Sequence, residues 1–134
     1  MATDHIQLIW DCGCAGTAQT PSGSCLDVGS SGKWTAEHLL MAAAESAVMT
    51  SFVAIANEEG LDVLGYVSSA GTESETGAPS AIRVVVRPCI VVAREADLAR
   101  ARELLRRALE RSPVARALGS ALRTDPEVVV VESS

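Results

Sequence analysis

Aromatic side chains, histidine and positive charge are all scarce in this sequence. Phe, Trp and Tyr together make up 3% of the 134 residues, only two histidines are present, and the net charge is −6. A core without large rings must be built from Val, Leu, Ile and Ala, which leaves room for a partner subunit to complete part of it. The acidic balance argues against a nucleic-acid partner, because phosphates require a basic surface.

Secretory and membrane signals are also lacking. Residues 1–9 do not combine a basic segment with a long apolar one, as a signal peptide does. The longest apolar stretch, residues 39–56, is interrupted by Glu45, whereas a membrane span needs roughly 20 predominantly apolar residues. We therefore expect a cytoplasmic protein outside the membrane, with its four cysteines as reduced thiols.

Hydrophobic residues make up 48% of the chain and charged residues 21%, which is the balance of a globular protein. The length suits a single domain over residues 1–134. Turn residues and hydrophobic periodicity predict strands at residues 5–10, 17–19, 24–28, 61–70, 81–92 and 127–131. Helices are predicted at residues 35–59, at 96–111 and from 112 onwards, and a polar loop at 71–80. This pattern predicts an α+β fold of order βββ-α-ββ-αα-β.

The long helix is central to this prediction. Thr35 is a good N-cap residue, and Gly60 can end the helix in the left-handed conformation. Small residues gather on one face and large apolar residues on the opposite one, so we expect a buried helix whose small face lies close to another backbone. Glu45 lies on the large apolar side, and we expect it to be exposed or paired with Arg83 or Arg87.

Two segments carry a resemblance to a known family. Residues 33–47 read KWTAEHLLMAAAESA, and residues 112–115 read Ser-Pro-Val-Ala. In this order and at this separation they resemble the OsmC/Ohr family of osmotically inducible proteins and organic hydroperoxide resistance proteins. The resemblance covers nearly the whole chain. It implies an intertwined α+β homodimer with two interface sites, where one cysteine attacks an organic hydroperoxide and a second condenses with it to a disulfide.

The resemblance also places the residues of that site on this sequence. The attacking cysteine corresponds to Ala47 and the resolving cysteine to Ser112, while Glu37 matches a glutamate of the family and Cys14 lies near the position of its arginine. Peroxide reduction requires a thiolate, which neither alanine nor serine supplies. The resemblance therefore implies a degenerate site at Ala47, Ser112 and Glu37, with Ala47 in the small-residue seam and Ser112 as a helix N-cap.

Four cysteines remain elsewhere, and their pattern leaves alternatives open. Cys12 and Cys14 are separated by one glycine, a spacing that suits a metal pair, a strained disulfide or an inert turn, although a metal site needs further ligands. Zinc is only weakly indicated, so we expect no metal and no cofactor. Cys25 and Cys89 are interpreted as small buried hydrophobic residues.

Three functional hypotheses follow. The first is a homodimer without the peroxidase centre that binds a small hydrophobic molecule at its interface. The second is a thiol-dependent hydroperoxide reductase that uses Cys14 with Cys12 or Cys25. The third is a structural or regulatory dimer without a ligand.

Overall fold

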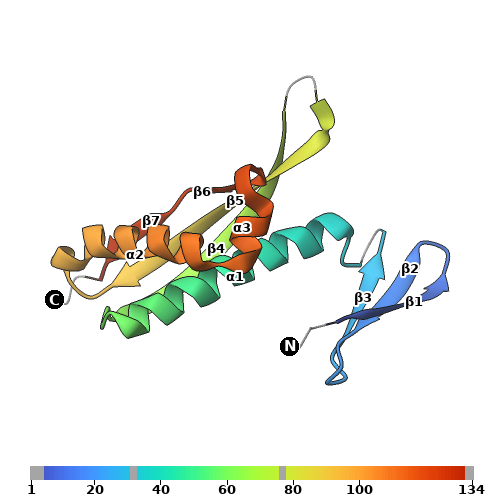
Figure 1. The fold of residues 1–134 in the computed structure, drawn as a ribbon, viewed down its shortest axis with the longest axis horizontal. Coiled ribbons are helices and arrows are strands. Elements are labelled where there is room, and N and C mark those ends of the chain that lie inside the picture. Colours follow the sequence, from blue (N-terminus) through green and yellow to red (C-terminus); the bar gives the residue numbers. More distant parts are fainter. Residues whose placement is uncertain (1–4, 31–32, 76–77, 132–134) are drawn as a thin grey trace. The chain divides into compact units, whose positions relative to one another are not determined.

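The computed structural model describes residues 5–30, 33–75 and 78–131, which form three α-helices, two short 3₁₀-helices and two sheets (Figure 1). Two compact units are formed by residues 1–40 and 41–134. The α+β class is confirmed, and so is the predicted order, to which the structure adds one short strand near the C-terminus.

The first unit contains a three-stranded antiparallel sheet. Its strands follow one another in sequence as β1 (Gln7–Cys12), β2 (Ala15–Gln19) and β3 (Cys25–Gly29). A turn joins β2 to β3 between the two predicted strands, and in it the amide of Gly23 donates to the carbonyl of Thr20 at 3.0 Å. The sheet is thin, and β1 is exposed along its whole length.

Helix α1 (Ala36–Glu58) begins where the sequence predicted, through a reciprocal cap. The amide of His38 donates to Oγ1 of Thr35 at 3.1 Å, and the amide of Thr35 donates back to Nδ1 of His38 at 3.2 Å. Histidine thus takes the place that glutamate has in a capping box. Both amides would otherwise lack a helical partner, so this pair fixes the first turn.

The end of α1 is also the predicted one. Gly60 has φ +71°, the amide of Gly60 donates to the carbonyl of Asn57, and the amide of Leu61 donates to the carbonyl of Ala56. These two bonds are the pattern of a Schellman motif, which satisfies the last carbonyls and turns the chain.

A long hairpin dominates the sheet of the second unit. Strands β4 (Val63–Glu75) and β5 (Ala78–Val92) pair antiparallel, so the loop predicted at residues 71–80 is wrong except at 76–77, which lie outside the described residues. Backbone pairing carries the strands through a segment that looked like a loop by composition. On the other side of β5 lie two short parallel strands, β6 (Leu122–Thr124), which the sequence did not predict, and β7 (Glu127–Val130).

Pro88 lies within the central strand β5, although a proline has no N–H and is usually confined to edge strands or bulges. It faces Ser68 on β4. On the opposite side, β6 pairs with β5 up to Val86 and β7 pairs from Cys89 onwards. Proline is tolerated here because the neighbouring strand changes at this point, leaving no described ladder partner for the missing N–H.

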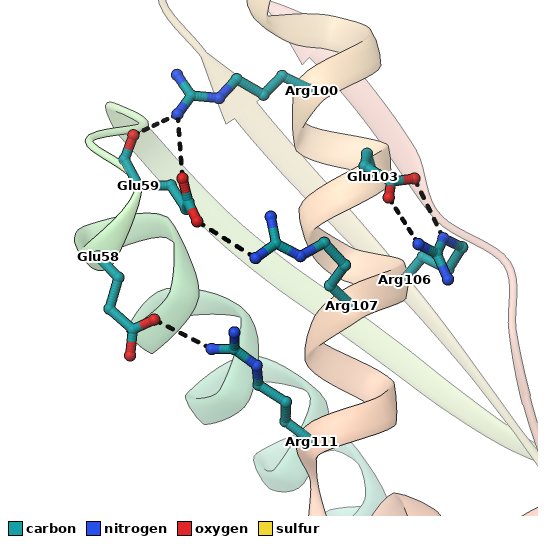
Figure 2. A network of polar contacts seen from close by, with 7 residues as sticks. All are labelled: Glu58, Glu59, Arg100, Glu103, Arg106, Arg107 and Arg111. Carbon is teal, nitrogen blue, oxygen red and sulfur yellow. Dashed lines mark hydrogen bonds and ion pairs between the residues drawn. The ribbon is translucent and has the colours of Figure 1, made fainter.

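Helices α2 (Leu98–Arg111) and α3 (Pro113–Leu118) complete the second unit. A 3₁₀ turn at Glu95–Asp97 precedes α2, where the sequence predicted helix. Figures 1 and 2 show α2 beside the C-terminal half of α1, with the sheet behind both helices.

Ion pairs join the two helices (Figure 2). Glu59, just past the end of α1, pairs with Arg100 at 3.8 Å and with Arg107 at 3.3 Å, and Glu58 pairs with Arg111 at 3.0 Å. These contacts join the end of α1 to α2 at an exposed edge. Another cluster lies on α2 alone, where the Arg106 guanidinium donates to Glu103 and holds the pKa of that carboxyl below its usual range.

In this chain only one face of α1 is buried, whereas the sequence predicted a buried helix. The buried face carries Val48, Phe52 and Ile55 together with Ala44 and Ala56. On the small-residue face, Ala43 and Ala54 are exposed and Ala47 is half-buried. By length and composition α1 could cross a membrane. Within this chain, however, 33% of its most apolar 18-residue stretch is buried, and the ring of Phe52 contacts the ring of Tyr66 on β4. The part of α1 from Met41 onwards contributes buried residues to the core of the second unit.

Candidate functional site

Ala47 is half-buried in the middle of α1, where it offers only a methyl group. Thr50 lies on the same face, and its Oγ1 donates to the carbonyls of Ser46 at 2.8 Å and Ala47 at 3.4 Å. That hydroxyl is therefore committed to the helix backbone. Neither Ala47 nor Thr50 therefore supplies a free nucleophile.

Ser112 joins α2 to α3, and its side chain acts as the predicted N-cap. The residue is 1% exposed, its Oγ accepts from the amide of Ala115 at 3.3 Å, and Pro113 follows in the first helical turn. A serine nucleophile needs a base within hydrogen-bond reach. Among the described residues no hydrogen bond joins Ser112 to a histidine or a carboxylate, so its role here is to begin α3.

Glu37 lies exposed in the first turn of α1, within the first unit. A carboxylate at this place is favoured by the free N–H groups of the helix start. Ala47 and Ser112 belong to the second unit. The interpretation of these three residues as a degenerate family site stays a prediction.

The C-x-C pair forms a tight turn of the β1–β2 hairpin. Cys12 pairs with Ala15, so Gly13 and Cys14 are the two turn residues, and Gly13 has φ +54°. Trp10 supports the turn, because its Nε1 donates to the carbonyl of Gly13 at 2.8 Å. Both cysteines are exposed free thiols. Within the described ranges no group of three or more His, Cys, Asp or Glu side chains is placed to hold a metal ion.

Cys14 also borders a shallow apolar hollow of about 250 Å³. The hollow lies wholly in the first unit, and its lining includes Leu8, Trp10 and Val28. Gly29 packs tightly here, because a Cβ added to it would lie 2.4 Å from the carbonyl oxygen of Cys14. Gly29 also has a φ of +150°, which residues with a side chain rarely adopt. The backbone of Cys14 therefore lies in close contact with Gly29, and Cys14 is one of the residues that line the hollow.

The other two cysteines differ from the prediction of buried residues. Cys25 is exposed, with its Sγ 3.5 Å from the carbonyl of Gly23, and Cys89 is half-buried on β5. Cys25 faces Gln19, at the end of β2 opposite to Cys14. At about 3.3 Å per strand residue this is a separation of roughly 15 Å, too far for a disulfide, whose Cα atoms lie less than about 7 Å apart. In this structure Cys12 is therefore much better placed than Cys25 to pair with Cys14.

A polar cluster in the second unit was missed by sequence reasoning. Glu45 is neither exposed nor paired in the expected way: it is half-buried and accepts a short hydrogen bond from Oγ of Ser68 on β4. Nearby, the hydroxyl of Tyr66 is buried and has no hydrogen-bond partner in the described part of the chain. Burial, and secondarily the charge of Glu45, raises the pKa of Tyr66 to about 12. The alternation of β4 could have placed Tyr66 and Ser68 on one face, but only the packing of α1 shows what they meet.

Comparisons with known proteins agree with this fold. The family model for OsmC-like protein matches residues 29–127. No protein with a curated description matches the sequence. An OsmC-like protein of unknown function from Vibrio cholerae has a similar structure, with a TM-score of 0.76 and 19% identity over 98% of this chain and 99% of that one.

Two further solved structures have a similar fold. The OsmC-like protein from Mycoplasma pneumoniae has a TM-score of 0.78 and 12% identity, covering 98% of this chain and 99% of that one. The organic hydroperoxide resistance protein of Bacillus subtilis has a TM-score of 0.66 and 16% identity, covering 95% and 98%. Because the sequence identities are this low, these structures show a shared fold and nothing about a shared activity.

Proposed function

Because the chain belongs to the OsmC-like protein family, we propose that it is a soluble, cytoplasmic, single-domain homodimer that has lost the thiol peroxidase centre and binds a small hydrophobic molecule at its interface. The observation that carries this proposal is the pair Ala47 and Ser112, which stand where the resemblance places the two reactive cysteines. None of the four cysteines of the chain lies on a helix.

The chemistry of these two residues supports the loss of peroxidase activity. In the family reaction a thiolate attacks a peroxide oxygen, the O–O bond breaks, an alcohol leaves and sulfenic acid remains. The methyl group of Ala47 has no lone pair with which to begin this step. The hydroxyl of Ser112 is buried and accepts from the amide of Ala115, so it serves the start of α3.

Exposed apolar residues support the homodimer. On α1, Met49 and Val53 are 41% and 38% exposed, next to a face of exposed alanines. On β1, Leu8 and Trp10 are 64% and 73% exposed. Clusters of exposed apolar residues favour an interface, and a small-residue face lets a second helix approach closely. A pocket for an apolar ligand would then lie between the subunits.

The test is a peroxidase assay of the purified protein. With cumene hydroperoxide and dithiothreitol we expect no turnover above that of a variant in which all four cysteines are serine. A rate typical of an enzyme would overturn the proposal. Ligand binding is tested on the same sample by calorimetry with small apolar molecules, and the absence of any binding would favour a purely structural dimer.

A second candidate function is a hydroperoxide reductase that uses the C-x-C pair. It is favoured by the exposed thiol of Cys14 beside the apolar hollow with Trp10. In this reaction the Cys14 thiolate would attack the peroxide, releasing an alcohol. The Cys12 thiol would then displace water from the sulfenic acid, and an external dithiol would reduce the resulting disulfide.

Intact-mass spectrometry separates the two candidates. The second function predicts that peroxide removes two hydrogen atoms by joining Cys12 to Cys14, and that Cys14→Ser abolishes turnover. Cys89→Ser on β5 is the matched control and should keep the full rate. If peroxide leaves all four thiols unchanged, the second function is excluded.

A further inference from the structure

The start of α1 is held by an imidazole that accepts a hydrogen bond, which it does only when that nitrogen carries no proton. Nδ1 of His38 accepts from the amide of Thr35 at 3.2 Å. A backbone amide donates and never accepts, so Nδ1 must be the unprotonated nitrogen of a neutral ring. In return, the amide of His38 donates to Oγ1 of Thr35 at 3.1 Å. Half of this reciprocal cap therefore exists in only one protonation state of His38.

The neighbours of the imidazole fix its position. The ring of Trp34 meets the ring of His38 nearly at a right angle, with the two centroids 6.2 Å apart. The backbone of Trp34 is tied to β3, since its amide donates to the carbonyl of Asp27 at 3.2 Å and its carbonyl accepts from the amide of Gly29 at 3.0 Å. The cap thus lies at the junction between β3 and the first turn of α1.

Protonation of His38 acts against this cap in two ways. Nδ1 becomes a donor, so the amide of Thr35 loses its acceptor and turns to water. The imidazolium also places a positive charge at the N-terminus of the helix, where the helix dipole disfavours a cation. Both effects weaken the first turn of α1 and leave the rest of the helix unchanged, because capping and dipole effects are confined to the end of a helix.

Solvent protons have direct access to this ring, because His38 is exposed. The charged residues of the same junction are Glu37 in the first turn of α1, Lys33 next to Trp34, and Asp27 on β3. Within residues 5–30, 33–75 and 78–131, His38 forms no ion pair with a carboxylate; its side chain interacts with Thr35 and Trp34. No ion pair in these ranges therefore compensates for the bond that protonation breaks.

We propose that His38 is a pH-sensitive cap of α1: the neutral imidazole closes the start of the helix, and protonation opens it. Imidazole is the side chain whose charge changes between about pH 8 and pH 5. The capped state binds one proton fewer than the open state, so a lower pH shifts the population toward the open state. The bonds between Trp34 and β3 do not depend on this proton, so opening is confined to the first turn of α1.

Nuclear magnetic resonance of the isotope-labelled, full-length protein tests this cap directly. As the pH falls from about 8 to about 5, we expect the amide proton of Thr35 to move upfield with the same midpoint as the imidazole of His38, because its hydrogen bond is lost. His38→Gln keeps an acceptor at this position of the capping box at every pH, so its Thr35 amide should not move. A Thr35 amide that stays in place in the native protein while His38 titrates would overturn the proposal.

Unfolding equilibria, measured at one protein concentration, separate an opening cap from a histidine that titrates without effect. Over the same pH range, the unfolding constant of the native protein should rise about fivefold more than that of His38→Gln, which is the usual effect of one lost N-cap interaction. His5→Gln changes the other histidine of the chain and should keep the full fivefold difference. An equal rise in the native protein and His38→Gln would show that His38 does not control the start of α1.

Discussion

Tyr66 is the one tyrosine of the chain, so its ionisation can be followed without interference. Burial raises its pKa from 10.0 to about 12. We expect the near-ultraviolet phenolate band of the native protein to rise with a midpoint near that value. A midpoint at the ordinary pKa would show that the hydroxyl is in contact with water, contrary to its buried position.

The same shift makes stability depend on pH at the alkaline end. The folded pKa lies above the unfolded pKa, so the contribution of Tyr66 is fully present below the unfolded value of 10.0 and is lost as pH rises toward about 12. Two pKa units correspond to about 2.7 kcal/mol, which we reduce to about 1–2 kcal/mol because the ring is half-exposed. Urea unfolding should show this loss in the native protein and a smaller one in Tyr66→Phe.

Restoring thiols tests the meaning of Ala47 and Ser112. If both stand at the positions of reactive cysteines, the double variant Ala47→Cys/Ser112→Cys should form an intramolecular disulfide with cumene hydroperoxide. Its turnover with dithiothreitol should exceed that of the native protein by about tenfold or more, because a paired, activated thiolate is far more reactive than an ordinary one. Ala99→Cys, an exposed position on α2, is the matched control. A double variant no faster than this control would argue against the assignment.

Helix ends are the elements that the sequence defined best, and Gly60 shows why. Its φ of +71° strains any residue with a Cβ, while no atom lies within 4 Å of the place where that Cβ would be. Gly60→Ala should therefore lower the free energy of unfolding by about 1 kcal/mol through backbone strain alone. Gly60→Asn should lower it less, because asparagine tolerates the left-handed conformation. Equal losses for the two variants would contradict this explanation.

The ion pairs between α1 and α2 are exposed, so we expect each to contribute little (Figure 2). A double-mutant cycle on Glu59 and Arg107 should give a coupling of about 0.2–1 kcal/mol that decreases with added salt. Arg102 lies on the same helix but bonds to the carbonyl of Pro126, so a cycle with Glu59 should be additive. A coupling unaffected by salt would point to a contact other than the ion pair.

What the sequence could predict among the elements depended on local chemistry. Helix ends could be predicted from capping residues, because capping involves only neighbours in the sequence. These residues are Thr35, Gly60, Ser112 and Pro113. The long β4–β5 hairpin was missed beyond residue 70, because cross-strand pairing holds a polar segment that looks like a loop by itself. The short strand β6 was missed for the same reason, since it exists only by pairing with β5.

The candidate site shows the same limit more sharply. Ala47 and Ser112 could be singled out from motifs, and the cap formed by Ser112 followed from the adjacent proline. The contact of Glu45 with Ser68 could not be predicted, because it joins residues 23 positions apart and depends on how α1 packs against β4. Sequence patterns identify residues that act with their neighbours, whereas a cluster between elements depends on packing.

At the scale of the whole molecule, the small-residue face of α1 gives the last prediction. Ala54 is exposed on this face, so Ala54→Glu should be harmless to a lone chain and even suits a helix surface. In a homodimer whose helices approach closely there, the same charge would be forced into an interface. We expect light scattering to give twice the chain mass for the native protein and a larger monomer fraction for Ala54→Glu, with unfolding that depends on protein concentration. Ala99→Glu, on an exposed alanine of α2, should remain dimeric. A native protein that is monomeric and folded at micromolar concentration would reject the homodimer, and with it any pocket that two subunits form together.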